Sequence, residues 1–185
     1  MIYEPKWKSL LANTVGPLFT PQQCQDIINM GHKQKAEKAL VGHEKGITGG
    51  KYDTKKRVTT ISWIPFKALP EMYKIIETTM LRVNGNHFGY EGMQLTEVAQ
   101  FTEYPKGGFY DWHMDADVNC QYEPPVRKIS MTILLSPQMK IGDFYVFPYD
   151  VRHCVYPMTN KKAKRRTLVC NVDVEYNPVS SRTAQ

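Results

Sequence analysis

Residues 100–117 read QFTEYPKGGFYDWHMDAD, and the last eight of them place one histidine among three aspartates. In an extended segment, residues two positions apart point to the same side of the chain. His113 and Asp115 could therefore approach one metal ion from neighbouring positions. The same tripeptide also occurs in plain polar loops, so the stretch alone leaves both readings open.

A metal site of this kind needs a third ligand from another part of the chain. Of the remaining histidines, His32 falls in a predicted helix, His43 in a long loop and His87 after a turn, whereas His153 falls in a predicted strand. Two imidazoles and one carboxylate on one face of an octahedral ion leave three positions open. That arrangement is typical of non-haem Fe(II) oxygenases, whereas structural zinc sites are closed and tetrahedral.

The composition is that of an ordinary globular protein of 185 residues, 42% hydrophobic and 23% charged, which is enough for about one domain with a real core. No apolar run approaches the roughly 18 residues of a membrane span, and the N-terminus lacks the apolar block of a signal peptide. We therefore expect a soluble, cytoplasmic protein with no membrane partner. The four cysteines form no C-x-x-C pair and are expected to be free thiols.

Much of the net charge of +6 comes from the run KKAKRR at residues 161–166. Such a run marks either a nucleic-acid contact or a solvated turn. It is compatible with an acidic or RNA-associated partner and does not demand one.

Two helices are predicted before residue 90. Thr20 as a cap, Pro21 at the first helical position and Gln23 completing a capping box predict a helix over about 21–35. A second helix over about 69–83 is predicted by an apolar stripe, and Asn84-Gly85-Asn86 is expected to end it. The stripe consists of Leu69, Met72, Ile76, Met80 and Val83.

Short β-branched and aromatic runs follow. The predicted strands are 58–64, 94–103, 109–113, 128–135, 143–147, 151–156 and 165–173. Strands this close together, without helices between them, favour a sandwich or barrel over a parallel sheet. We predict a mainly β fold with N-terminal helices (α+β) in a single domain: helical support over about 1–90, a β core over about 93–175 and a tail over 176–185. The glycine-rich segment 41–57 is either a connector or a lid over a site.

Three ordered motifs carry a resemblance to a known family. They are residues 100–117, the run GDFYVFP at 142–148 followed by His153 and Pro157, and Arg127-Lys128-Ile129-Ser130 at the start of a strand. Together they resemble the Fe(II)- and 2-oxoglutarate-dependent dioxygenases, particularly the prolyl 4-hydroxylase-like group, over about residues 58–174. The resemblance implies a double-stranded β-helix (a jelly-roll or cupin-like barrel) that uses 2-oxoglutarate and O2 as cosubstrates, with ascorbate in support.

The resemblance also implies site residues. Fe(II) would be held by His113, Asp115 and His153; Asp117 could replace Asp115, but the H-x-D spacing favours Asp115. The cosubstrate would be bound by Tyr104, Arg165 and Thr167. Arg165 is expected because a guanidinium can hold the far carboxylate with two hydrogen bonds, and Thr167 and Val169 would share its face. The turn before this strand is longer than in the family, so Arg166 and Lys164 compete with Arg165.

The implied reaction is the hydroxylation of a prolyl residue in a protein or peptide, coupled to the decarboxylation of 2-oxoglutarate to succinate and CO2. Another side chain, a small molecule or a nucleic acid could be the substrate of the same chemistry. From a different class, the chain could be a non-catalytic cupin-like binding module.

One departure from the family concerns the strands. Only residues 137–141 separate Ser136 from Gly142, where family members carry a longer piece with its own strands. Either the barrel is minimal or a segment is missing from the sequence. A distance too long for the chain to traverse would indicate the second.

Overall fold

The computed structural model describes residues 9–13, 15–41, 52–115, 126–136, 141–157 and 164–174. In this part of the chain, two α-helices accompany two antiparallel sheets. The helices are α1 (Pro21–Lys33) and α2 (Pro70–Val83), and a short 3-10 turn, η1 (Phe66–Ala68), precedes α2. None of the helices in the described ranges combines the length and the apolar character that crossing a membrane requires.

The large sheet has seven strands in one path and an eighth beside it. In sheet order they are β1 (Ala12–Asn13), β8 (Phe144–Pro148), β7 (Val126–Leu134), β10 (Arg165–Val174), β5 (Ala99–Tyr104), β3 (Thr60–Ile64) and β2 (Glu37–Lys38), and β4 (Met93–Gln94) pairs with β10. The small sheet consists of β6 (Tyr110–His113) and β9 (His153–Val155).

Helix α1 begins where the capping box predicts. The Gln23 backbone N–H donates to Thr20 Oγ1 at 3.2 Å, and the Thr20 backbone N–H donates to Gln23 Oε1 at 2.9 Å. These reciprocal bonds satisfy donors that a helix N-terminus otherwise leaves free.

The predicted end of the second helix is only partly right. Helix α2 stops at Val83, but Asn84-Gly85-Asn86 does not end the helical path, because Asn84–Phe88 form a π-helical turn, η2. The Asn84 side chain bonds the backbone N–H and C=O of Tyr90, and Phe88 is fully buried. Gly89, with φ 75°, ends the turn.

The two faces of the large sheet differ in chemistry. Side chains alternate along each strand, so one set packs with the helices and the other points away from them. The helix-facing set is apolar and belongs to the main core: Ala99, Phe101, Ile129, Met131, Ile133, Val146, Leu168 and Cys170. The opposite set is largely polar although buried or half-buried: Gln100, Thr102, Tyr104, Ser130, Thr132, Arg165 and Thr167.

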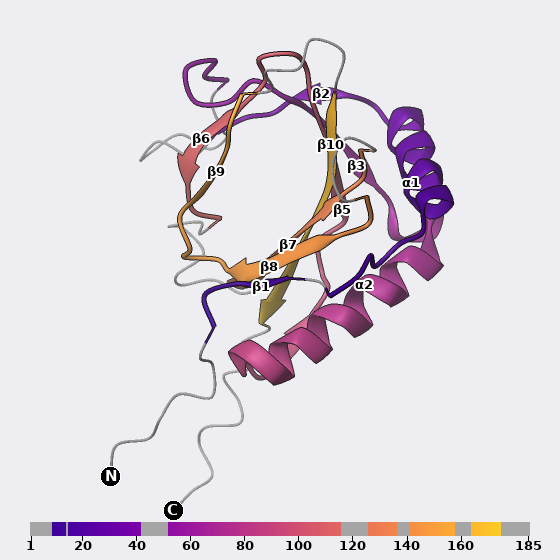
Figure 1. The fold of residues 1–185 in the computed structure, drawn as a ribbon, viewed down its shortest axis with the longest axis vertical. Coiled ribbons are helices and arrows are strands. Elements are labelled where there is room, and N and C mark those ends of the chain that lie inside the picture. The colour runs from indigo at the N-terminus through magenta and orange to yellow at the C-terminus, as the bar shows by residue number, and fades with distance from the viewer. Residues whose placement is uncertain are drawn as a thin grey trace, which may run out of the picture.

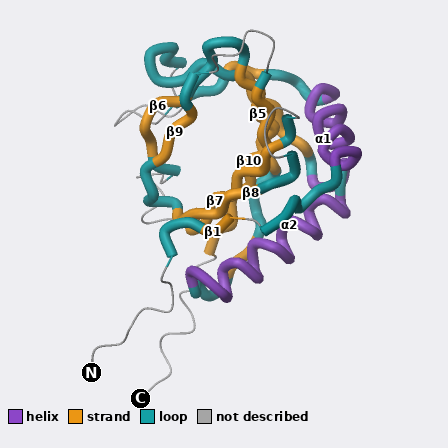
Figure 2. The backbone as a smooth tube through the Cα atoms, in the orientation of Figure 1, coloured by secondary structure: helices purple, strands orange, loops and turns teal. Residues whose placement is uncertain are grey.

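Three layers result. In Figure 1 the helices lie outside the large sheet, and β6 and β9 lie on its other side. Figure 2 shows the same arrangement, with the helices in purple along one side of the strands. Phe147 of the large sheet contacts His153 of the small sheet at 4.5 Å between ring centroids. The polar face of the large sheet is therefore the face that looks toward the small sheet.

Strand β7 leads into β8 through a hairpin. The Leu134 backbone N–H donates to the Asp143 carbonyl at 2.8 Å, and the Gly142 N–H donates to the Leu134 carbonyl at 2.7 Å. The ends of the short connection are thus hydrogen-bonded neighbours. Residues 137–141 are long enough to join ends that lie this close together.

Candidate metal centre

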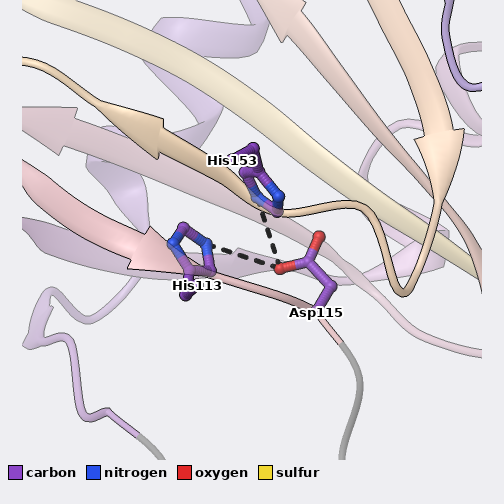
Figure 3. A group of neighbouring side chains, drawn as sticks. All are labelled: His113, Asp115 and His153. Carbon is purple, nitrogen blue, oxygen red and sulfur yellow. Dashed lines mark ion pairs between the residues drawn. The ribbon is translucent and has the colours of Figure 1, made fainter.

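Two histidines and one aspartate converge between the sheets. His113 ends β6, and its direct partner in the neighbouring strand is His153 at the start of β9. Asp115 follows His113 by two residues, and its Oδ1 lies 3.6 Å from His113 Nε2 and 3.7 Å from His153 Nε2 (Figure 3). One ligand atom from each side chain lies within 4.8 Å of the others.

Both imidazoles are oriented by the same kind of bond. His113 Nδ1 lies 2.8 Å from the Asp111 carbonyl and His153 Nδ1 lies 3.0 Å from the Val151 carbonyl. A carbonyl only accepts, so each Nδ1 donates and each Nε2 faces Asp115. A register shift between Tyr110 and His113 turns the strand at this point.

The environment keeps His113 ready to bind a metal. Burial lowers the pKa of the His113 imidazole to about 4, and the neighbouring His153 acts in the same direction, while the bond to the Asp111 carbonyl opposes them. The ring is therefore neutral near pH 7, as a metal ligand must be.

Arg127 anchors the backbone of the carboxylate ligand. Its Nη1 donates to the Asp115 carbonyl at 3.1 Å, and its Nη2 lies 2.8 Å from both carboxylate oxygens of Glu97. Asn171 Nδ2 completes the network with a bond of 3.0 Å to Glu97. The sequence motif singled out Arg127 but gave no indication of this contact.

The structure separates the three competing cations of β10. Arg166 Nε and Lys164 Nζ bind Glu103 at 2.7 and 3.1 Å, on the side where Glu103 also meets His32 of α1. Arg165 alternates to the opposite face and pairs in register with Tyr104. Only Arg165 of the three is thus directed toward the polar face.

Tyr104 and Thr167 also lie on the polar face, as expected from their positions. Thr167 pairs in register with Thr102, two residues along each strand from the pair formed by Arg165 and Tyr104, so both pairs share one face. Burial raises the pKa of the Tyr104 hydroxyl, while the positive charges of Arg57 and Arg165 act against it.

Arg57 lies close to the candidate metal centre, a position that the sequence did not reveal. Its side chain is buried, its Nη2 donates to Gln100 Oε1 at 3.1 Å, and its Cζ lies 4.4 Å from the centre of the Tyr110 ring. Tyr110 in turn stacks on His113, with ring centroids 3.4 Å apart and an interplanar angle of 16°. In the sequence Arg57 only ends a charged, glycine-rich segment, so no local pattern distinguished it.

The polar face fits a metal ion with an anionic ligand. Several buried polar atoms in the described residues make no hydrogen bond: Arg57 Nε, Arg165 Nε, Ser130 Oγ and Asn171 Oδ1. Orphaned groups of this kind are rare in native interiors, and here they lie on the polar side of the large sheet or beside it. The donor set of two imidazoles and one carboxylate is that of an open iron(II) site.

Two predictions concern residues outside the described ranges. Asp117, the alternative carboxylate ligand, is one of them. Most of the segment 41–57, the predicted lid or connector, is the other.

Known proteins share the fold of this chain. No family model matches the sequence, and no curated protein does either. Among solved structures, a prolyl-4-hydroxylase from Pseudomonas putida matches with a TM-score of 0.65 at 15% identity, covering 90% of this chain and 94% of that one. The viral collagen prolyl hydroxylase of Paramecium bursaria Chlorella virus-1, as its 2-oxoglutarate complex, matches with a TM-score of 0.65 at 15% identity, covering 90% and 97%.

A third similar structure carries a broader family name and no named substrate. It is an oxidoreductase of the 2OG-Fe(II) oxygenase family from Burkholderia pseudomallei, with a TM-score of 0.59 at 14% identity, covering 89% of this chain and 85% of that one. The predicted double-stranded β-helix supported by two helices is thereby confirmed.

Proposed function

We propose that this chain is an Fe(II)- and 2-oxoglutarate-dependent dioxygenase that hydroxylates a prolyl residue of a protein or peptide. One observation carries the proposal: His113, Asp115 and His153 present three ligand atoms within 4.8 Å of one another. They do so on a fold that prolyl hydroxylases share.

In this proposal His113, Asp115 and His153 would hold the iron. Their Nδ1 bonds hold the two imidazoles so that Nε2 is the ligand atom, and Arg127 holds the backbone of Asp115. When bound, iron(II) with 2-oxoglutarate and O2 supplies the oxidant for a C–H bond, yielding succinate, CO2 and the hydroxylated product. The protein contributes the positions of the ligand atoms and of the residues around them.

The far carboxylate of the cosubstrate is assigned to Arg165, with Tyr104 and Thr167 beside it. A buried carboxylate requires a cation, and the guanidinium fork can hold it with two hydrogen bonds. Arg165 suits this role because its Nε is buried without a hydrogen-bond partner. Unlike Lys164 and Arg166, it also lies on the polar face of the sheet.

The prolyl substrate is inferred from the neighbours, of which two are prolyl hydroxylases. Another side chain, a small molecule or a nucleic acid would use the same ligand set. For an RNA-associated target, the described residues offer no support, because Lys164 and Arg166 of the basic run are both bound to Glu103.

The assay of choice measures turnover of the cosubstrate. Purified protein with Fe(II), ascorbate and 2-oxoglutarate is expected to release succinate, and His113→Ala is expected to abolish the release. His87→Ala, which changes a histidine outside the site, serves as the matched control and should retain it.

Equal behaviour of the wild type and His113→Ala would contradict the proposal and favour a non-catalytic cupin-like binding module. Mass spectrometry of co-expressed proteins then addresses the substrate. An added oxygen on proline that disappears with Asp115→Ala would identify it, whereas an added oxygen on another residue would correct the substrate class.

A further inference from the structure

The guanidinium of Arg57 is a buried positive charge among neutral groups. The side chain is 8% exposed. Its neutral neighbours are the amide oxygen of Gln100, the ring and hydroxyl of Tyr110 and the hydroxyl of Tyr104, and its Nε has no hydrogen-bond partner. Among the described residues, no acidic side chain lies within ion-pair distance of it.

Arg57 is one ring removed from the metal ligands. The imidazole of His113 covers one face of the Tyr110 ring at 3.4 Å. The Arg57 guanidinium, 4.4 Å from the same ring centre, therefore lies against the other face.

Arg57 and Arg165 approach the same hydroxyl. The positive charges of both lower the pKa of Tyr104 against the effect of its burial. Arg165 pairs with Tyr104 in register from β10, whereas Arg57 reaches the same face through Gln100 of β5. Two guanidinium groups thus lie near Tyr104 without an acidic partner in the described residues.

Such an arrangement is costly without an anion. Burying a charge that has no opposite charge is strongly unfavourable, and two like charges near each other add to this cost. A carboxylate that accepts hydrogen bonds from both guanidinium groups would relieve it.

We infer that Arg57 is a second guanidinium for the far carboxylate of a 2-oxo dicarboxylic acid, so that Arg57 and Arg165 hold that carboxylate from two sides, next to Tyr104. This inference rests on the proposed function and adds a binding residue from the segment before β3. The pocket then selects dicarboxylates over monocarboxylates more strongly than one arginine would allow.

Binding, rather than turnover, tests the inference. The protein is loaded with Mn(II), which suits carboxylate and imidazole ligands, and titrated calorimetrically with 2-oxoglutarate and with 2-oxopentanoate. The second compound has the same carbon chain but lacks the far carboxylate. We expect Arg57→Gln to weaken the binding of 2-oxoglutarate about tenfold or more, and to change the affinities for 2-oxopentanoate and Mn(II) by less than about twofold. Arg57→Lys should recover part of the loss.

Two controls separate this inference from the proposed function. Arg165→Gln should weaken 2-oxoglutarate binding as well, and Arg166→Gln, on the other face of β10, should leave it unchanged. If the wild type fails to bind 2-oxoglutarate, the proposed function fails and the inference fails with it. If the wild type binds and Arg165→Gln weakens binding while Arg57→Gln does not, the inference alone is overturned.

A further readout excludes a merely structural role. Removing a buried charge without a counter-charge should leave the melting temperature of the ligand-free Arg57→Gln protein unchanged or higher, while reducing the rise that 2-oxoglutarate causes. A ligand-free variant that melts much lower, or that loses affinity for both 2-oxo acids equally, would show that Arg57 supports the fold or the metal ligands and would overturn the inference.

Discussion

Consecutive cations on β10 contact different parts of the molecule because strand side chains alternate. Arg166 turns toward the helices and meets Glu103 at 2.7 Å, whereas Arg165 turns toward the polar face. Their residue type is identical and their chemical surroundings are opposite. The register of β10 against β5 therefore decides which arginine can bind a ligand.

Glu103 provides a test of the helix-side contacts. Burial would raise the pKa of its carboxyl group, but hydrogen bonds from Arg166, Lys164 and His32 outweigh burial and hold the pKa below its ordinary value. A depressed carboxyl pKa contributes stability above the pKa of the unfolded chain, about 4.5, and this stability is lost as the pH falls through the folded-state pKa. The contribution is modest, because Lys164 is 56% exposed and its bond is screened by solvent.

We predict that Glu103→Gln lowers the free energy of unfolding by about 1–2 kcal/mol at pH 7, and that the difference from the wild type shrinks below about pH 4. Urea unfolding at pH 7 and pH 3.5 measures both values. Glu77→Gln, an exposed site on α2, should change stability by less than about 0.5 kcal/mol at either pH. A Glu103→Gln effect that is the same at both values of pH would refute the electrostatic explanation.

The sequence indicated His113, Asp115 and His153 of the candidate site but not Arg57, for a physical reason. His113 and Asp115 are neighbours in the chain, and the motif around His153 is local as well, so spacing could indicate all three. Arg57 contacts Gln100, which lies 43 residues further along the chain, and its ring contact to Tyr110 comes from yet another strand. No local pattern encodes contacts of this kind.

At the scale of elements, α1 packs tightly against the large sheet at Gly31. A Cβ added to Gly31 would lie 2.4 Å from Cγ of Phe101 and within 2.9 Å of both adjacent ring carbons. The Gly31 carbonyl also accepts a bond of 2.8 Å from Ser62 Oγ of β3, which fixes the helix to the sheet. The helix cannot withdraw without breaking this bond.

We therefore predict that Gly31→Ala destabilises the fold. Overpacking at a tight contact costs about 1–3 kcal/mol, which exceeds the gain of about 1 kcal/mol or less from the higher helix propensity of alanine. Gly85→Ala is the matched control, because an added Cβ there meets nothing within 4 Å. It should be neutral or stabilising by less than about 1 kcal/mol. Urea unfolding compares the two, and a Gly31→Ala protein as stable as Gly85→Ala would contradict the packing argument.

Helices and strands could be predicted where residues close together in the sequence determine them. The capping box at Thr20 and the apolar stripe of α2 depend only on neighbours in the chain, and both helices were found within two residues of their ends. The two-residue strands β1, β2 and β4 exist only because a longer strand lies beside them. The π-helical turn after α2 depends on Asn84 reaching Tyr90 and on the burial of Phe88, which no helix-ending signal reports.

Across the whole molecule, the large sheet has two buried faces of different character. The apolar face holds the helices, and the polar face holds groups that are expensive to bury, among them Arg57 and Arg165. The apolar side of the sheet thus holds the main core, while the polar side holds buried groups without hydrogen-bond partners. The assignment of residues 1–185 to a single domain stays a prediction.

Because buried polar groups on the polar face lack partners, we predict that ligands which bind there raise the melting temperature of the protein. At a concentration of about 100 times its dissociation constant, a ligand that binds only the folded state adds ~2.7 kcal/mol to the free energy of unfolding, which raises the melting temperature of a chain of this size by about 5–10 °C.

We expect Mn(II) to produce a rise of this order and 2-oxoglutarate to add a second rise only when the metal is present. His113→Ala lacks one of the three ligand atoms and should respond to neither ligand. Thermal unfolding with and without each ligand measures these shifts. A wild-type melting temperature that Mn(II) leaves unchanged, or a metal response that survives in His113→Ala, would mean that the polar face is not organised around a metal ion.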